Sequence, residues 1–299
     1  MLACHACSIA VASALLAACA TRPSHEVGFE LHGDASAFLP GVVSSEYSEI
    51  RAAVSPEGDC VLWGSTNRPG GAGGWDIWMS RRRDGAWSAP VAVAFDTPAN
   101  EFDPAFAADG RSVYFFSNRA GGYGGDDLWQ VAFDPATATF GTPANLGAGV
   151  NSAGDEWAPT PSAGGRQLLF ATNGRGGAGR HDLFSSEWRD GAWQAAAPLP
   201  GEVNGAGDDF DAAWLDDGRV LVFARSDDVE NAPIALWSAV REGDRYVRAR
   251  RLDARVNVDR GWILAPSIDA AEPGVLLFSG ERPGGQGRAD IHSIHYRMR

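Results

Sequence analysis

The sequence predicts an all-β protein, a five-bladed β-propeller of four-stranded antiparallel blades, with a six-bladed ring as the alternative. A glycine-rich segment recurs at nearly constant spacing, and similar short strands and turns surround each copy. No stretch of the 299 residues has helical periodicity. Repeats of this length with four strands per unit are typical of propeller blades.

The glycine-rich segment is present in four copies that align without gaps. Its fourth, fifth and seventh columns are always glycine, and its tenth is always aspartate. The copies read NRPGGAGGWDIW (67–78), NRAGGYGGDDLW (118–129), NGRGGAGRHDLF (173–184) and ERPGGQGRADIH (281–292). With a weaker copy included, the anchors Asp76, Asp127, Asp182, Ala235 and Asp290 are 51, 55, 53 and 55 residues apart.

Each copy follows two predicted strands that are joined by a turn. In the second copy these are a strand over 101–106, a turn at 108–110 and an aromatic strand over 113–117. Glycine in such a turn supplies a positive φ at little cost. A further strand downstream carries an aromatic residue and then a proline, as in Trp87 with Pro90. The weaker copy keeps its aromatic strand at 220–223 but replaces the glycine loop with the acidic run 226–231.

The last copy ends soon after its third strand, at 291–296, and lacks a fourth. Residues 28–32 are expected to supply that strand, because closing the ring removes an edge that would otherwise invite aggregation. Residues 20–46 are too few for another blade, which favours five blades over six.

The run S-N-R-x-G-G-x-G-G-x-D-[IL]-W, which residues 117–129 match almost position by position, resembles the TolB-type WD40-like (PD40) propeller repeat. The resemblance covers roughly residues 46–294. It implies a location in the cell envelope and a role as a protein-binding scaffold rather than a reaction. TolB itself carries an additional α/β domain and more blades, and neither is evident in this chain.

The N-terminus reads as a bacterial export signal. Residues 8–18 form an apolar run that is too short to span a bilayer, and Leu16-Ala17-Ala18-Cys19 resembles a lipobox. We therefore predict a signal peptide over 1–18, lipidation of Cys19, a lipidated tether over 19–27 and the propeller domain over 28–299. Ala20 favours the outer membrane, facing the periplasm. The alternative is an ordinary secretory peptide in which the cysteine is incidental. The first residues carry no Lys or Arg, so either the true start lies upstream or the signal is weak.

The charge balance excludes several partners. A formal net charge of −13 disfavours nucleic acid and anionic membrane surfaces, so we expect membrane contact only through Cys19. All 25 cationic residues counted as Lys or Arg are arginines, which excludes Schiff-base and P-loop lysine chemistry. We expect a monomer that uses no cofactor and no metal and binds an envelope protein.

Two columns of the repeat are predicted to be structural. A recurring arginine and a recurring aspartate are expected either to pair with each other or to leave the carboxylate free to satisfy loop N–H groups. These residues are Arg68, Arg119, Arg175 and Arg282 with Asp76, Asp127, Asp182 and Asp290.

A second set of residues is predicted to rim the mouth of the channel. A meander places the start of each first strand beside the glycine loops, so acidic and aromatic residues should gather there. These are Glu49, Glu101, Asp103, Asp155, Glu156, Trp157, Asp208, Asp209 and Asp259, accompanied by Phe102, Phe210 and Trp262. Such a rim suits a basic peptide, a sugar or a cation, and the plainer interpretation is solvated turn acids beside core aromatics.

The sequence shows no catalytic constellation and indicates a non-enzymatic protein. No G-x-S-x-G motif is present, and His292 and His295 are placed to face opposite sides of one strand. A carbohydrate-active enzyme needs carboxylates confined to particular blades, whereas these acids recur in most blades. The leading hypothesis is a protein-binding scaffold, with a glycosidase-like enzyme or a ligand- or cation-binding sensor as the alternatives.

Overall fold

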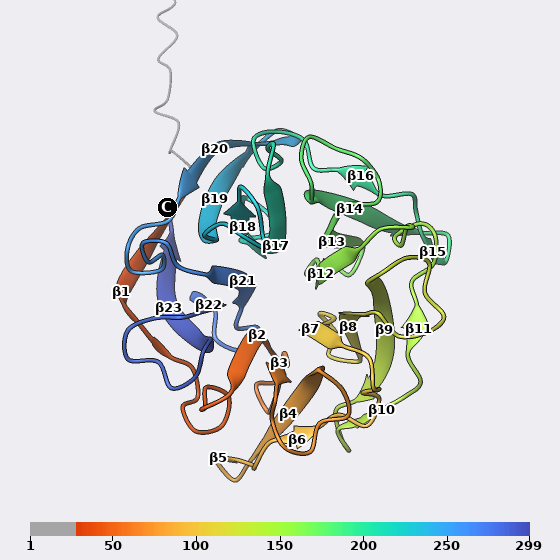
Figure 1. The fold of residues 1–299 in the computed structure, drawn as a ribbon, viewed down its shortest axis with the longest axis vertical. Coiled ribbons are helices and arrows are strands. Elements are labelled where there is room, and N and C mark those ends of the chain that lie inside the picture. Colours follow the sequence, from red (N-terminus) through yellow and green to blue (C-terminus); the bar gives the residue numbers. More distant parts are fainter. Residues whose placement is uncertain (1–27) are drawn as a thin grey trace, which may run out of the picture.

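The computed structural model describes residues 28–299, which form five antiparallel sheets arranged radially about one axis (Figure 1). The prediction of a five-bladed β-propeller is confirmed, and the six-bladed alternative is wrong. The predicted signal peptide at 1–18 and tether at 19–27, with Cys19, lie outside the described residues. Within the described part of the chain, no helix is long and apolar enough to cross a membrane.

The blades follow one another in chain order, and each meanders outward from the axis. The innermost strands are β2 (Ser48–Val54), β7 (Glu101–Phe106), β12 (Glu156–Pro161), β17 (Asp208–Leu215) and β21 (Ile263–Ile268). The second strands are β3 (Cys60–Thr66), β8 (Ser112–Ser117), β13 (Gln167–Thr172), β18 (Val220–Ser226) and β22 (Val275–Gly280). The third strands are β4 (Trp75–Arg83), β9 (Asp127–Asp134), β14 (Asp182–Arg189), β19 (Ala235–Glu242) and β23 (Asp290–Met298).

The outermost strand differs between blades. In the first three it is broken into the short pairs β5 (Ala86–Trp87) and β6 (Val91–Ala92), β10 (Thr139–Phe140) and β11 (Ala144–Asn145), and β15 (Ala192–Trp193) and β16 (Ala197–Pro198). Pro90 and Pro143 lie at the breaks of the first two blades, Pro198 lies in β16 just after the third break, and proline cannot donate to a ladder. The fourth blade has no proline there, and β20 (Arg245–Arg251) runs unbroken.

The two ends of the described chain close the ring. Strand β1 (Phe29–Ala37) pairs antiparallel with β23, from Phe29 opposite Met298 to Ala37 opposite His292 (Figure 1). The Arg299 N–H also donates to the Gly28 carbonyl at 2.9 Å. The prediction that the segment from residue 28 supplies the missing strand is confirmed, and the strand extends further than residue 32.

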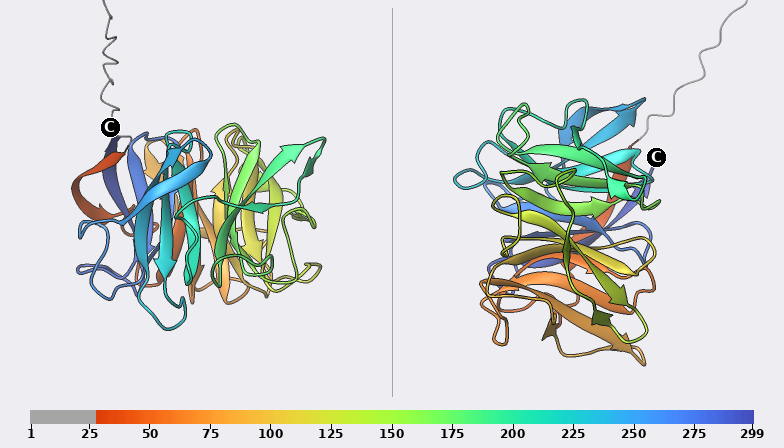
Figure 2. Two further views of the ribbon diagram at one scale, coloured as in Figure 1. Left: turned by 90° about the horizontal axis from the view of Figure 1, so that it is seen from above. Right: turned by 90° about the vertical axis from the view of Figure 1, so that its right-hand side faces the viewer.

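The strands of every blade run between two faces of the propeller (Figure 2). The glycine-loop face carries the loops between second and third strands and the links between blades. The turn face carries the turns between first and second strands, which include Gly58, Gly110, Gly165, Gly218 and Gly274, all with positive φ.

The core lies between the blades and is centred on one position of the second strand. Trp63, Phe115, Phe170, Phe223 and Phe278 are each at most 1% exposed. Both sides of each inner sheet pack against neighbouring blades, so these strands are apolar runs rather than alternating ones.

Every innermost strand carries a β-bulge, and one residue in each bulge has a positive φ although it is not glycine. The bulge residues are Arg51, Asp103, Ala158, Asp211 and Ala265, with φ between 42° and 53°. A bulge bends a strand and re-aims a side chain. The five bulge residues therefore occupy equivalent places around the central channel.

The three invariant glycine columns meet three separate constraints, which the second blade illustrates. Gly121 has a φ of 96°, a conformation that other residues rarely adopt. A Cβ on Gly122 would lie 1.7 Å from the Asp127 carboxylate, and a Cβ on Gly124 would lie 2.1 Å from the Gly154 carbonyl oxygen in the link to the next blade. The loop therefore needs glycine for its turn, for its aspartate and for its contact with the neighbouring blade.

We expect Gly124→Ala to destabilise the propeller by about 1–3 kcal/mol, the usual cost of forcing an added methyl into a packed contact. Chemical denaturation monitored by tryptophan fluorescence measures this. Gly164→Ala is the matched control, because no atom lies within 4 Å of the added Cβ and its φ is not positive. Equal midpoints for the two variants would contradict the interpretation.

Candidate functional site

Four of the five innermost strands have a buried carboxylate near their start. Glu49, Glu101, Glu156 and Asp209 are each at most 1% exposed, and Ile263 takes the same place in the fifth blade. Burial raises the pKa of Glu49 to about 7 and raises the pKa of Glu156 and Asp209.

Each of these carboxylates accepts hydrogen bonds from the link that leads into its own blade. The N–H and hydroxyl of Thr97 donate to Glu101 at 3.0 and 2.7 Å, and Ser152 donates to Glu156 in the same way at 2.8 and 2.5 Å. Ser45 binds Glu49 with both groups. The acids are therefore part of the framework of the fold.

In several blades an arginine that stacks on aromatic rings lies beside the buried carboxylate. Arg119 Nη2 lies 2.9 Å from Glu101, and its guanidinium carbon lies 4.9 Å from the centre of the Phe115 ring. In the fourth blade Arg225 has this role, 2.5 Å from the shorter Asp209. Sequence reasoning missed Arg225, because it comes from the end of the second strand and not from the glycine-loop column.

The recurring arginine and aspartate of the repeat do not pair with each other. Arg68 lies 4.0 Å from Glu49, while Arg175 and Arg282 donate to backbone carbonyls of the preceding link. The alternative, a carboxylate that satisfies loop N–H groups, is the arrangement observed. Loop N–H groups donate to Asp76 at 2.8 and 2.9 Å, to Asp127 at 2.6 Å, to Asp182 at 3.1 Å and to Asp290 at 2.8 Å.

The structure corrects the expected acidic rim. Most of its carboxylates are buried because they bind the links and loops, and they do not face solvent. At most 2% of Glu49, Glu101, Asp103, Glu156, Asp208 and Asp209 is exposed. Asp155 is half-buried and accepts from the Asp126 N–H at 3.0 Å, and Asp259 is exposed.

One asymmetric cluster does lie on the glycine-loop face, between the third and fourth blades. His181 stacks on Trp157 with ring centres 3.9 Å apart, and its Nδ1 lies 2.7 Å from Asp208. Trp157 donates from Nε1 to Asp126 at 2.9 Å, and burial raises the pKa of Asp126. The sequence offered Trp157 and Asp208 as rim residues but not Asp126, because its column varies between blades.

Three bulge residues meet in the central channel. Arg51, Asp103 and Asp211 come from the first, second and fourth blades, and each is at most 3% exposed. Burial, with the charge of Asp211, raises the pKa of Asp103 well above its ordinary value, and burial raises the pKa of Asp211 to about 6. The equivalent residues of the other two blades are Ala158 and Ala265.

A cavity in the described part of the chain opens on the turn face, opposite the predicted rim. It has a volume of about 1060 Å³, and Arg51 is one of its lining residues. Apolar side chains that line it include Val54, Phe106, Trp214 and Ile268. Asp216, Asp217, Asp244 and Asp269 also line it and come from the turns around its opening.

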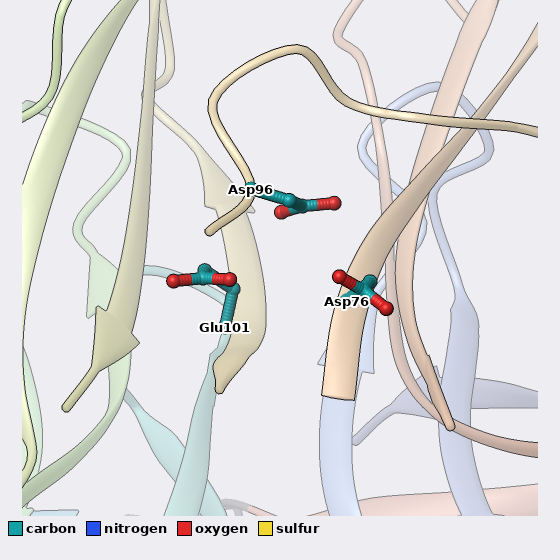
Figure 3. Close-up of side chains that lie close together, drawn as sticks. All are labelled: Asp76, Asp96 and Glu101. Carbon is teal, nitrogen blue, oxygen red and sulfur yellow. The ribbon is translucent and has the colours of Figure 1, made fainter. Parts of the chain in front are cut away.

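A group of three carboxylates lies between the first two blades, from the start of β4, the link after it and the start of β7 (Figure 3). One oxygen each of Asp76, Asp96 and Glu101 lies within 4.8 Å of the others. Glu101 already accepts hydrogen bonds from Thr97, Ser117 and Arg119. The Arg119 charge opposes a cation here, and the absence of a metal stays a prediction.

Asp96 takes a place that asparagine fills in three other blades. Asn151 accepts from the Leu128 N–H at 2.8 Å and donates to the Leu128 carbonyl at 3.0 Å, which pins a third strand to the next link. Asp96 accepts from the Ile77 N–H at 3.3 Å, but its Oδ2 is buried without a partner. Burial raises the pKa of Asp96 to about 8, so a protonated carboxyl can act as the amide does.

Comparison with known proteins supports the fold alone. No family model matches the chain, and no curated protein matches it. Among solved structures, an α-L-arabinofuranosidase from Lactobacillus brevis is similar at a TM-score of 0.55 and 9% identity, covering 84% of this chain and 91% of that one. A Dyadobacter fermentans protein of unknown function is similar at a TM-score of 0.50 and 14% identity, covering 83% and 76%.

TolB from Acinetobacter baumannii is a further structural neighbour, at a TM-score of 0.49 and 13% identity. The match covers 84% of this chain and 56% of TolB, so the chain spans a little over half the length of that protein. The first two neighbours support the propeller fold alone, and the likeness to TolB carries no conclusion.

We expect Asp96→Asn to stabilise the protein increasingly as pH rises from about 4 to about 8. The folded-state pKa of Asp96 is raised, so between about pH 4 and pH 8 the unfolded chain releases this proton while the native protein keeps it. The wild-type protein therefore loses stability through that window and loses no more above it. Asparagine keeps both hydrogen bonds at every pH, with a gain of about 1–3 kcal/mol by pH 8. Urea unfolding at pH 5 and pH 8 tests this, and a gain independent of pH would contradict it.

Proposed function

We propose that this protein is a non-catalytic scaffold of the cell envelope that holds a segment of a partner protein in the turn-face cavity. The observation that carries the proposal is the cavity itself. Its volume of about 1060 Å³ is at the upper end of the range for small-molecule sites and admits several side chains.

The lining of the cavity defines the chemistry of the partner segment. Trp214 and Phe106 offer aromatic surface inside, and Ile268 is 42% exposed at its edge. Asp216 lies in one turn at the opening and pairs with Arg219 at 2.6 Å. Asp217, Asp244 and Asp269 lie in the turns around the opening and attract positive charge. An extended segment with apolar residues followed by Lys or Arg fits this arrangement.

The envelope location and the monomeric state are part of the same proposal. The lipobox at Cys19 supports anchoring in the outer membrane, and the PD40-like repeat supports a scaffold role in the periplasm. An arrangement with the cavity facing the periplasm leaves the turn face free to receive a partner.

Photo-crosslinking in the native host tests the site. A photoreactive residue at Trp214 or Ile268 is expected to capture one discrete protein through a basic, apolar segment, and the same residue at Tyr123, on the glycine-loop face, is not. A synthetic peptide of the captured segment should bind the purified protein, and binding should weaken with salt and in Asp217→Asn/Asp244→Asn. Equal capture at all three positions would refute the site.

One observation favours a carbohydrate-active enzyme as the second candidate. Asp103 and Asp211 are confined to particular blades, and their pKa values are raised to different extents, which is the pattern that acid and nucleophile carboxylates require. This candidate ranks second because neither carboxyl lines the cavity.

We expect the purified protein to leave a panel of plant and bacterial oligosaccharides intact over a day. Mass spectrometry of the products decides the matter. Turnover that is lost in both Asp103→Asn and Asp211→Asn would replace the scaffold with an enzyme, whereas turnover that survives both changes would indicate a contaminant.

A further inference from the structure

Arg51 crosses the central channel. It comes from the bulge of β2 in the first blade, and its Nη2 donates to the Thr160 hydroxyl at 2.5 Å and to the Pro159 carbonyl at 3.3 Å in the third blade. These two blades are not neighbours, so the side chain reaches across the axis. It therefore closes the inner end of the turn-face cavity, of which it is a lining residue.

Most of the Arg51 guanidinium is without a partner. Arg51 is 2% exposed, yet its Nε and Nη1 atoms are buried with no hydrogen bond. Asp103 and Asp211 are near enough to sense its charge, but neither makes an ion pair with it. The N–H groups of a buried guanidinium normally all donate hydrogen bonds, because an unpaired donor loses its hydration and gains no hydrogen bond in exchange.

The architecture does not require a cation at this place. The equivalent bulge residues of the third and fifth blades are Ala158 and Ala265, which adopt the same positive φ. A buried, partly unpaired charge that alanine can replace in other blades is a liability to the fold. Its unpaired N–H donors are therefore available to bind a ligand that enters the cavity.

The other residues that line the cavity restrict the chemical class of the ligand. Val54, Phe106 and Trp214 present apolar surface between the opening and Arg51. An ammonium group at the inner end would be repelled by the guanidinium. A carboxylate would accept its free N–H groups in a site shielded from water, where such bonds are strong.

We propose that Arg51 binds the C-terminal carboxylate of the partner segment, which enters the turn-face cavity end first. This inference rests on the proposed function, and it adds the direction in which the segment lies. The carboxylate is at the inner end of the cavity, the apolar side chains of the segment contact the cavity walls, and its basic residues contact the acidic turns. The raised pKa of Asp103 favours its uncharged form, whereas Asp211, with a pKa of about 6, is charged near neutral pH and offsets part of the Arg51 charge.

The test uses the full chain and a labelled pool of hexapeptides, each with a basic N-terminal half and an apolar C-terminal half. Each peptide is made as the free acid and as the C-terminal amide, and binding is measured by fluorescence anisotropy. We expect the acids to bind at least about tenfold more tightly than the amides. This comparison needs no variant of the protein.

Variants then assign the effect to Arg51. Arg51→Met should bring the affinity for the acids down to that for the amides, and Arg51→Lys should keep part of the difference. Arg241→Met is the matched control, because Arg241 also lines the cavity but is exposed at its opening. It should keep the full difference, and circular dichroism and thermal melts verify folding.

The outcomes separate this inference from the proposed function. Crosslinking at Trp214 together with equal binding of acids and amides would leave the scaffold standing and overturn the role of Arg51. Decanoate that binds better than decanol and better than every peptide, with the same dependence on Arg51, would assign the site to a small free acid and overturn the protein terminus. No preference for any carboxylate would also overturn the inference.

Discussion

The propeller depends on a carboxylate that is buried at the start of an innermost strand. It collects an N–H and a hydroxyl from the link before it and, in three blades, pairs with an arginine that lies on the aromatic rings of the second and third strands. One group thus joins a link, an inner strand and the aromatic core of its blade. Removing either partner of such a buried pair costs far more than a surface ion pair is worth, because the other charge stays buried.

The fifth blade shows what happens when the carboxylate is replaced. Ile263 occupies its place, and Arg282 donates to the Val256 carbonyl instead. The fourth blade shows a different compensation, since a shorter acid, Asp209, is met by Arg225 from a nearer position. The motif therefore tolerates change when the arginine finds another acceptor or when a second arginine meets the shorter acid.

The fold could be predicted from the sequence because every blade of a propeller places the same steric and hydrogen-bonding constraints on equivalent residues. Gly121, Gly122 and Gly124 each obey a constraint that recurs in other blades, so the same letters recur at a fixed distance. The exposure of the acids could not be predicted in this way. Recurrence shows that Glu101 is required, but it does not distinguish a solvated rim from a buried anchor.

The candidate site was harder to predict because it consists of departures from the repeat. Arg51 and Asp211 lie in columns where other blades have alanine, and Asp96 stands where three others have asparagine. A fixed offset from the buried acid does not single out Asp96, because the first blade has Ser44 there and Asn257 lies one residue further from Ile263. The meeting of Arg51 with Thr160 across the axis depends on ring closure, which no local pattern expresses.

The pairing of β1 with β23 has a consequence for how the molecule is made. The two strands are separated by almost the whole described chain, so the seam between them is the contact with the greatest loop entropy to overcome. Four blades can form before the fifth is complete. The fifth is finished only when the C-terminal strand pairs with the first one, so a chain that ends before residue 290 leaves β1 and β22 each with an unpaired edge.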